Sequence, residues 1–396
     1  MLKFRDNRNL LIIALIALVN MLGYGIVIPI LYAYSKKFGL SDLQNGLLFA
    51  TFSICQFIST PIIGRMSDKY GRRPLLLISI IGTALSFFIM AFAQSAAFLF
   101  LARALDGFTA GNIPVAFAVI SDSTKPEDRA RAFGLIGSAF SFGFVFGPAI
   151  SALTVGFGQA IPFIIAGLIT VVAAVLTGLY LPETNKHMGE VSSGKLFDFP
   201  RLWRTLFDPN VGATFVISLV YFMAFSCALI YGFQPFTLKV LKVSLSQNAF
   251  LFTIFGIVGL ISQNLVVHRV SKKLGIKKAF STGIVLTSAA LLIMFFSRTL
   301  PVFIGASIML GIFNGIAQTL IPTILSREAD AKSQGSIMGL NASYQSIGMI
   351  IGPILGGIIA TLFIPLPFLA GSILVFLCFF LSFQVMRPGV KKESAF

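Results

Sequence analysis

Two long apolar stretches are joined by ten residues rich in charge, Gly64-Arg65-Met66-Ser67-Asp68-Lys69-Tyr70-Gly71-Arg72-Arg73. The run fits the pattern G-x-x-x-D-[R/K]-x-G-[R/K]-[R/K] at every specified position. Each flanking stretch, 44–64 and 74–94, has the roughly 20 apolar residues that a helix needs to cross a bilayer. The run therefore predicts a short charged loop between two membrane-spanning helices.

The rest of the chain continues this alternation of apolar segments and short polar connections. Of its 396 residues, 56% are hydrophobic and 11% are charged, and the mean hydropathy is +0.91. A soluble domain cannot bury so much apolar surface, and lipid does not tolerate unpaired backbone, so we expect an all-α membrane protein. Segments of spanning length number about twelve, near 9–32, 44–64, 74–94, 97–120, 132–155, 160–181, 211–236, 247–268, 278–297, 300–323, 336–360 and 364–386.

The formal net charge of +16 raises the possibility of a nucleic-acid partner. However, the basic residues are distributed by loop and are not gathered on one soluble surface. If the N-terminus is cytoplasmic, most of the 30 Lys and Arg residues fall in inner segments, and the outer segments hold only Lys36, Lys37, Lys239, Lys242 and Arg298. Cytoplasmic loops carry such an excess. We expect both termini in the cytoplasm, a multi-pass protein of the bacterial inner (cytoplasmic) membrane, and no nucleic-acid partner.

A glycine-proline motif occurs twice in the chain, at a constant offset. Its first copy is Gly134, Gly143, Gly147 and Pro148, and its second is Gly339, Gly348, Gly352 and Pro353. Such internal similarity predicts two pseudo-repeats, and the polar stretch between them, with Pro, Ser and Gly, predicts a linker. The expected organisation is a six-helix bundle over 1–181, a cytoplasmic linker over 182–210 and a second six-helix bundle over 211–396. Glycines at this spacing also permit close helix packing in lipid, and both interpretations can hold.

The charged run resembles the cytoplasmic loop signature of the major facilitator superfamily, and the glycine motif is similar to the antiporter signature of its exporters, with Ser151 in place of the last glycine. The resemblance implies a substrate site between the two halves near mid-membrane, alternating access, and transport in the direction of efflux. It also implies a conformational latch, in which Asp68 meets the positive end of the eleventh span near Ser336. The latch residues are Gly64, Asp68, Gly71, Arg72, Arg73 and Asp122. Alternatively, the arginines only fix topology and touch anionic lipid.

Only two ionisable residues, Arg103 and Asp106, are expected well within a span. Charges at that depth are costly and are functional candidates by default, and a spacing of three residues places both side chains on one helical face. One interpretation is an internal ion pair that satisfies itself. The other is that Asp106 carries the coupled proton while Arg103 adjusts that proton binding and senses occupancy. The stretch 103–112 resembles the fourth-helix motif of the drug:proton antiporters, and the layout of the whole chain is similar to that of tetracycline-resistance carriers.

Amide and phenol groups occupy further mid-span positions and are the expected lining of a substrate cavity. They are Asn20, Tyr24, Asn112, Tyr221, Tyr231, Gln234, Asn314, Gln318, Asn341 and Tyr344. With 42 Phe residues they suggest an aromatic cavity with few polar groups, which suits amphiphilic drugs better than sugars. Single amides can also join helices to one another. The expected function is proton-coupled efflux of drugs or other amphiphilic molecules, and the alternatives are a carrier of a polar metabolite such as a sugar and a lipid flippase.

Motifs for other chemistry are missing from the sequence. There is no phosphate-binding G-x-x-x-x-G-K-[S/T] run, no H-E-x-x-H and no nucleophile elbow, so we do not expect an enzyme. Cys55, Cys227 and Cys378 fall in three different spans and are expected to be packing residues. We therefore expect no metal and no cofactor. The expected partners are a small-molecule substrate, protons and the bilayer, with the chain acting as a monomer.

Overall fold

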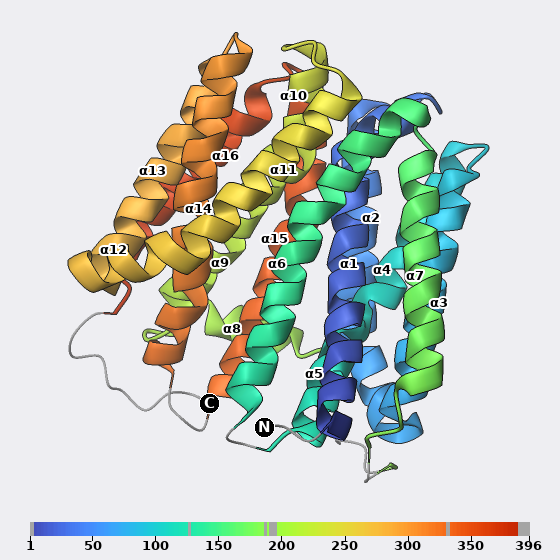
Figure 1. Cartoon of the computed structure of the whole chain (residues 1–396). Helices are drawn as coiled ribbons and strands as arrows, with labels where there is room; N and C mark the ends of the chain where they lie inside the picture. Colours follow the sequence, from blue (N-terminus) through green and yellow to red (C-terminus); the bar gives the residue numbers. More distant parts are fainter. Residues whose placement is uncertain (1–3, 126–127, 186–187, 190–195, 330–332, 387–396) are drawn as a thin grey trace. The chain divides into compact units, whose positions relative to one another are not determined.

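The computed structural model describes residues 4–125, 128–185, 188–189, 196–329 and 333–386, and these form helices and connections without a strand (Figure 1). The α-helices are α1 (Phe4–Lys36), α2 (Asp42–Tyr70), α3 (Arg72–Ala91), α4 (Ala96–Thr109), α5 (Ile113–Ser123), α6 (Arg129–Thr154), α7 (Ile161–Tyr180), α8 (Phe199–Thr205), α9 (Gly212–Phe225), α10 (Phe233–Lys239), α11 (Leu245–Ile261), α12 (Val267–Leu274), α13 (Ile276–Phe296), α14 (Leu300–Glu328), α15 (Gln334–Ala360) and α16 (Leu366–Ser382). Short 3₁₀-helices, η1 (Ala110–Asn112) and η3 (Val155–Phe157), and π-helices, η4 (Ser226–Gly232) and η5 (Ser262–Val266), extend or join them.

Eleven helical segments of the described chain are long and apolar enough to cross a membrane. Four of them join consecutive helices end to end, namely Ala96–Ser123, Arg131–Phe157, Gly212–Lys239 and Leu245–Leu274. The last apolar helix, α16, has 17 residues, so at 1.5 Å per residue it reaches about 26 Å, less than the roughly 30 Å of a hydrocarbon core. The all-α membrane class is confirmed, whereas the number of twelve spans and the side of the termini stay predictions.

The charged run that was expected as a loop is almost entirely helical, which corrects the sequence-based boundary. Helix α2 continues to Tyr70 and α3 begins at Arg72, so only Gly71 lies outside a helix. Gly71 has φ +102°, a conformation that glycine adopts without the steric penalty of a side chain. One residue therefore makes the whole turn, because a residue with free access to positive φ can reverse the chain at once.

Contacts divide the chain into two compact units. Unit 1 contains Met1–Leu40, Thr51–Phe197 and Ser244–Thr253, and unit 2 contains Ser41–Ala50, Asp198–Val243 and Ile254–Phe396. Two helices are divided between the units, since the first residues of α2 belong to unit 2 and the first residues of α11 belong to unit 1. Each unit thus includes a helix end from a distant part of the sequence.

Unit 1 is organised around α1, which packs along α6 and also contacts α5 and α7. Helix α3 lies between α4 and α7, and Figure 1 shows α3 and α7 running alongside one another. A cluster of buried aliphatic side chains, including Ile13, Ile16, Val115, Val119 and Ile136, fills the space where α1, α5 and α6 meet. Burial of these side chains holds α1, α5 and α6 against one another within unit 1.

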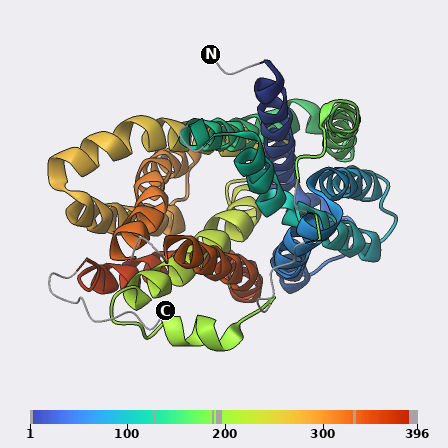
Figure 2. The same cartoon turned by 90° about the horizontal axis from the view of Figure 1, so that it is seen from below.

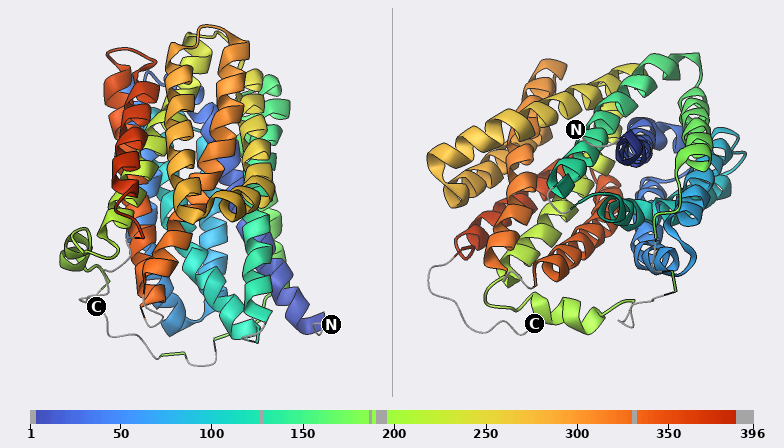
Figure 3. Two further views of the ribbon diagram at one scale, coloured as in Figure 1. Left: turned by 90° about the vertical axis from the view of Figure 1, so that its left-hand side faces the viewer. Right: turned by 60° about the horizontal axis from the view of Figure 1, so that its bottom comes forward.

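Unit 2 packs α15 and α16 against α9, and α13 against α14 and α16 (Figure 3). Two π-helices widen its spans. The Ser226 hydroxyl in η4 donates to the Gly348 carbonyl at 3.0 Å, and the Ser262 hydroxyl in η5 donates to the Ile312 carbonyl at 2.5 Å. Because a π-turn displaces the backbone from the α-helical path, it brings each hydroxyl toward the neighbouring helix.

Candidate functional site

The two intramembrane charges meet in the interior of unit 1. Arg103 Nη1 lies 3.2 Å from Asp106 Oδ2, and the side chains are 1% and 8% exposed. Both residues lie on α4, one helical turn apart, as their spacing predicted. The guanidinium Nε is buried and has no hydrogen-bond partner among the described residues. This single-contact pair leaves part of the buried guanidinium unsatisfied, and burial makes such unpaired polar groups costly.

An aromatic ring from α2 covers the same guanidinium. The Phe52 ring centroid lies 4.4 Å from Arg103 Cζ, within the range of a cation–π contact. Gly107 makes this approach possible, because a Cβ there would meet the Phe52 carbonyl oxygen and would lie 2.8 Å from Cys55 Cβ. Phe52 was not among the residues expected from the sequence. With 42 Phe in the chain, nothing in its local pattern distinguishes it.

Three further candidate residues join α1 to α2 and to η1. Asn20 Nδ2 on α1 donates to Asn112 Oδ1 at 3.0 Å, and the Tyr24 ring lies 5.8 Å from the Phe52 ring, centroid to centroid. Asn112 is fully buried at the η1 interruption between α4 and α5, and its Nδ2 has no partner in the described part of the chain. Pro114 lies two residues later, in the first turn of α5, and cannot donate an internal hydrogen bond, which favours a break at this place. The interruption therefore presents a polar amide inside an apolar span.

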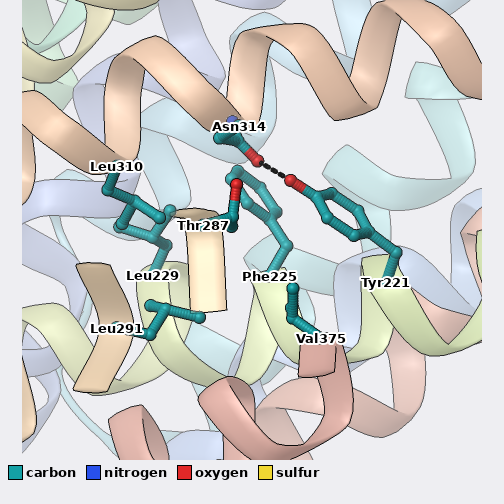
Figure 4. Close-up of a pocket in the computed structure, with 8 residues that line it drawn as sticks. All are labelled: Tyr221, Phe225, Leu229, Thr287, Leu291, Leu310, Asn314 and Val375. Carbon is teal, nitrogen blue, oxygen red and sulfur yellow. Dashed lines mark hydrogen bonds between the residues drawn. The ribbon is translucent and has the colours of Figure 1, made fainter. Parts of the chain in front are cut away.

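A second polar cluster lies in unit 2, around a small pocket between α9, η4, α13, α14 and α16. The Tyr221 hydroxyl donates to Asn314 Oδ1 at 2.7 Å, and Gln318 Nε2 lies 3.4 Å from the same oxygen. Figure 4 shows Tyr221, Asn314 and Thr287 directed into the pocket, whose other lining is Phe225, Leu229, Leu291, Leu310 and Val375. Even with the space that is open to the surroundings, its empty volume is only about 190 Å³, whereas typical ligand pockets begin at about 300 Å³. This pocket alone does not hold a drug-sized molecule.

The remaining expected cavity residues of unit 2 are occupied by protein contacts. Tyr231 donates to the Asp42 carbonyl at 2.9 Å, and Asn341 Oδ1 accepts from the Ser218 hydroxyl at 2.7 Å. The Tyr344 hydroxyl lies 2.6 Å from Thr205 Oγ1 and donates to the Leu202 carbonyl at 2.5 Å, so it holds α8. Gln234 is fully buried in α10. A role for these four side chains in substrate binding stays a prediction.

The residues of the charged run form one cluster with Asp122. Arg72 Nη1 lies 2.5 Å from Asp68 Oδ1 and 2.6 Å from Ser67 Oγ, and Arg72 Nε lies 3.4 Å from Asp122 Oδ2. Arg73 is directed elsewhere and donates from Nη2 to the Gly178 carbonyl of α7 at 2.6 Å. The cluster therefore joins the ends of α2, α3 and α5 within unit 1. The expected contact of Asp68 with the region near Ser336 stays a prediction.

Glu183 belongs to this cluster and was missed by sequence reasoning. Its carboxylate accepts from the backbone N–H groups of Arg72 at 2.9 Å and Arg73 at 3.1 Å, and also from those of Thr184 and Asn185. A carboxylate at the start of α3 satisfies donors that have no partner within the helix and complements the helix dipole. The only signal in the sequence is an acid directly after a span, at an end that is expected to be cytoplasmic and where basic residues are the rule.

Four glycines of the repeated motif, Gly143, Gly147, Gly348 and Gly352, bring helices into backbone contact, whereas nothing lies within 4 Å of a Cβ built at Gly134 or Gly339. A Cβ at Gly143 would lie 2.6 Å from the Leu18 carbonyl oxygen, and a Cβ at Gly147 would lie 2.6 Å from that of Leu22. In unit 2, a Cβ at Gly348 would lie 2.7 Å from the Leu219 carbonyl oxygen. Gly352 faces Cys227 N and Met223 in the same way. The motif thus packs α6 on α1 and α15 on α9 and η4, which is the packing role that small residues have in membranes.

The structure offers little for a metal. Among the described residues, no three His, Cys, Asp or Glu side chains lie close enough to hold one. The three cysteines are free thiols, with Cys227 and Cys378 buried and Cys55 beside Gly107. Two groups of charged side chains are left as candidates. One is the Arg103–Asp106 pair inside the span Ala96–Ser123, and the other is the cluster of Asp68, Arg72 and Asp122 at the helix ends.

Known proteins resemble the chain along most of its length. The family model described as Major Facilitator Superfamily matches residues 13–276 and 214–396. Tetracycline resistance protein, class B, of Escherichia coli is 30% identical over 368 residues, which cover 89% of this chain and 88% of that protein. Multidrug resistance protein 2 of Bacillus subtilis (strain 168) is 30% identical over 367 residues, 90% of each. A solved bacterial homolog of the human lysosomal transporter Spinster, inward-facing and occupied, matches with a TM-score of 0.79 over 96% of this chain and 98% of that one, at 15% identity.

Proposed function

The chain belongs to the major facilitator superfamily, and from this membership we propose that it exports drugs or other amphiphilic organic molecules by proton antiport and alternating access. The family consists of membrane transporters rather than enzymes, and the relatives with the drug-resistance names match nearly the whole chain. The proposal extends this to the coupling ion, the class of substrate and the direction. It also places the protein in the cytoplasmic membrane, with both termini inside.

The Arg103–Asp106 pair is the observation that carries the proposal. An antiporter needs a group at which the binding of a proton and the binding of substrate exclude each other. When Asp106 binds a proton it loses its charge, and the Arg103 guanidinium, 3.2 Å away, then retains only the Phe52 ring among these contacts. Since a lone buried charge is unfavourable, protonation of Asp106 favours a rearrangement of Arg103. That rearrangement is the coupling step that we propose.

Two features support an amphiphilic substrate. The contacts described above join the rings of Tyr24 on α1 and Phe52 on α2, and the amides of Asn20 on α1 and Asn112 in η1. Aromatic faces bind planar apolar molecules and cations, and a few amides provide orientation. A sugar would require many convergent hydrogen bonds, which this set of side chains does not supply. The names of the relatives, tetracycline resistance and multidrug resistance, agree with the same class.

For the charged cluster we propose a latch role within the transport cycle. Asp68, Arg72 and Asp122 tie the inner ends of α2, α3 and α5 together, and Glu183 holds the first turn of α3. Gly64, with nothing within 4 Å of its would-be Cβ, and Gly71 border this cluster. A cluster with two ion pairs can break and reform as helix ends move, because partly exposed pairs are individually weak.

The test is proton movement driven by substrate. Everted vesicles that contain the protein are energised, loaded with a pH-sensitive dye, and challenged with amphiphilic cations, neutral drugs and sugars. We expect drugs to raise the pH of the lumen in the wild type and to have no such effect in Asp106→Asn. Asp128→Asn, an acid outside the spans, is the matched control and should respond like the wild type.

The folding of Asp106→Asn must be checked before its transport is interpreted. Removing one member of a buried pair costs about 3–5 kcal/mol, so Asp106→Asn could fail to fold. The double variant Arg103→Gln/Asp106→Asn removes both charges, and monodispersity in detergent shows which variants are folded. Drug-driven pH change in a folded variant without Asp106 would refute the proton role. A wild type that responds to a sugar and to no drug would refute the substrate class.

A further inference from the structure

The short helix α8 has an aromatic face directed away from the rest of unit 2. Phe199, Trp203 and Phe207 recur every four residues, so they lie on one side of the helix and its last turn. Their surfaces are 61%, 67% and 70% exposed. The rings of Trp203 and Phe207 contact each other edge to face, with 5.5 Å between centroids. Three large apolar side chains thus form an exposed strip along a helix of seven residues and the turn that follows it.

The opposite side of α8 is fixed to α15, so the aromatic strip has a defined direction. The Tyr344 hydroxyl binds both Thr205 Oγ1 and the Leu202 carbonyl, and Arg201 Nη2 donates to Ser336 Oγ at 2.6 Å. Figure 2 shows α8 at the lower edge of the view, with its axis lying across the view. These hydrogen bonds prevent α8 from rotating its aromatic side inward. The exposure of the strip is therefore built into the fold.

The chemistry of α8 fits the boundary between lipid and water. Trp203 is the only tryptophan of the chain, and tryptophan is enriched at the level of the phospholipid headgroups. With seven residues α8 is too short to cross a bilayer, yet it ends only a few residues before the span Gly212–Lys239. In the sequence, the aromatic strip therefore comes just before the residue at which that span begins.

The charges of this segment also suit headgroups. Arg204 is exposed next to Trp203, and a guanidinium pairs well with phosphate. The two acids are directed to the backbone instead: Asp198 Oδ1 accepts from Arg201 N at 3.1 Å, and Asp208 Oδ1 accepts from Asn210 N at 2.8 Å. The outward side of α8 consequently combines aromatic rings with a cation, as in amphipathic helices that lie in the membrane interface.

We propose that α8 lies in the headgroup region of the bilayer, with Phe199, Trp203 and Phe207 inserted among phospholipids and Arg204 at the phosphates. The helix is then an interfacial anchor that ties α15 to one depth of the membrane through Tyr344 and Ser336. This inference does not depend on the substrate or on proton coupling. Other possible occupants of the strip, such as another part of this chain or a second copy, are outcomes of the test.

The single tryptophan makes the test direct, because wild-type fluorescence reports on α8 alone. The full chain is reconstituted into phosphatidylcholine vesicles whose acyl chains carry bromine either near the headgroup or near the chain end. We expect bromine near the headgroup to remove most of the emission, bromine near the chain end to remove less, and iodide in the water to remove little. The measurement needs no substitution, so it does not depend on the folding of a variant.

Two variants calibrate the result. Trp203→Phe should abolish the emission, and Val172→Trp in that background places the reporter at an outward position in the middle of the α7 span, where Val172 is 58% exposed. That reporter should be quenched more strongly by the deep bromine. Strong quenching of wild-type Trp203 by iodide, without quenching by either lipid, would place α8 in water and overturn the proposal. Protection from both lipid and iodide would mean that protein covers the strip, which would equally overturn it.

Discussion

Replacing Gly147 with alanine should weaken unit 1 measurably, because the new methyl group has no space. A Cβ at this position would lie 2.6 Å from the Leu22 carbonyl oxygen and 2.8 Å from Gly25 Cα. Both neighbours are backbone atoms of α1, and they cannot rotate away as a side chain can. To restore an ordinary contact of 3.4 Å, α1 and α6 must separate by about 0.8 Å, and overpacking of this kind typically costs about 1–3 kcal/mol.

Gly134→Ala is the matched control, since Gly134 lies on the same helix and nothing lies within 4 Å of its would-be Cβ. Alanine is favoured over glycine inside a helix by up to about 1 kcal/mol, and this gain is shared by both variants. The difference between the two variants therefore isolates the clash. We expect Gly147→Ala to be less stable than Gly134→Ala by about 1–3 kcal/mol.

The assay heats each variant in detergent, as a fusion to a fluorescent protein, and follows the fraction that remains monodisperse in size-exclusion chromatography. The midpoint for Gly147→Ala should lie clearly below that for Gly134→Ala, and Gly134→Ala should match or exceed the wild type. Equal midpoints for the two alanine variants would refute the reasoning, because they would mean that α1 and α6 do not touch at Gly147.

Two further predictions concern hydrogen bonds at the same packing surface and at the charged cluster. Ser151→Ala removes the 2.8 Å hydrogen bond from the fully buried Ser151 hydroxyl to the Ile26 carbonyl. The variant should lose about 0.6 kcal/mol of stability, a typical value for such bonds in membranes. A midpoint equal to that of the wild type in the heating assay would contradict this prediction. Glu183→Gln replaces the carboxylate that accepts from the backbone of Arg72 and Arg73. Since hydrogen bonds to charged groups contribute about 1.5–3 kcal/mol, hydrogen exchange at these two amides should become at least about tenfold faster, and unchanged exchange would argue against the capping role.

The sequence was sufficient for the fold class and for the ion pair, because both depend on local spacing. The length and polarity of apolar segments predict spans, since the bilayer imposes one thickness on all of them. Arg103 and Asp106 are one helical turn apart, so their contact follows from α-helical geometry alone. The failure at the charged run has an equally local cause. Glycine signals a turn, but the sequence does not reveal that the turn consists of Gly71 alone, with helical residues on both sides of it.

Contacts between distant segments could not be predicted from the sequence. Phe52 reaches Arg103 because Gly107 lets α2 approach α4, and the choice of this Phe among 42 depends on the packing of both helices. Glu183 meets Arg72 only because α7 returns the chain to the start of α3. The π-helices η4 and η5 had no signal either, since their extra residue is stabilised by hydroxyl contacts to neighbouring helices.

The packing and functional interpretations of the glycine motif converge on α1. Gly143 and Gly147 contact α1 at Leu18, Leu22 and Gly25, and this stretch of α1 also carries Asn20 and Tyr24. On another face of α1, Asn20 donates to Asn112 and Tyr24 packs against Phe52. The height and distance at which α6 holds α1 therefore set how Asn20 meets Asn112 in η1 and how Tyr24 meets Phe52 on α2. A displacement of α1 by a fraction of an ångström, too small to unfold unit 1, is comparable to the tolerance of a hydrogen bond of 3.0 Å. The motif thus acts on the candidate site through the position of α1, without contacting it.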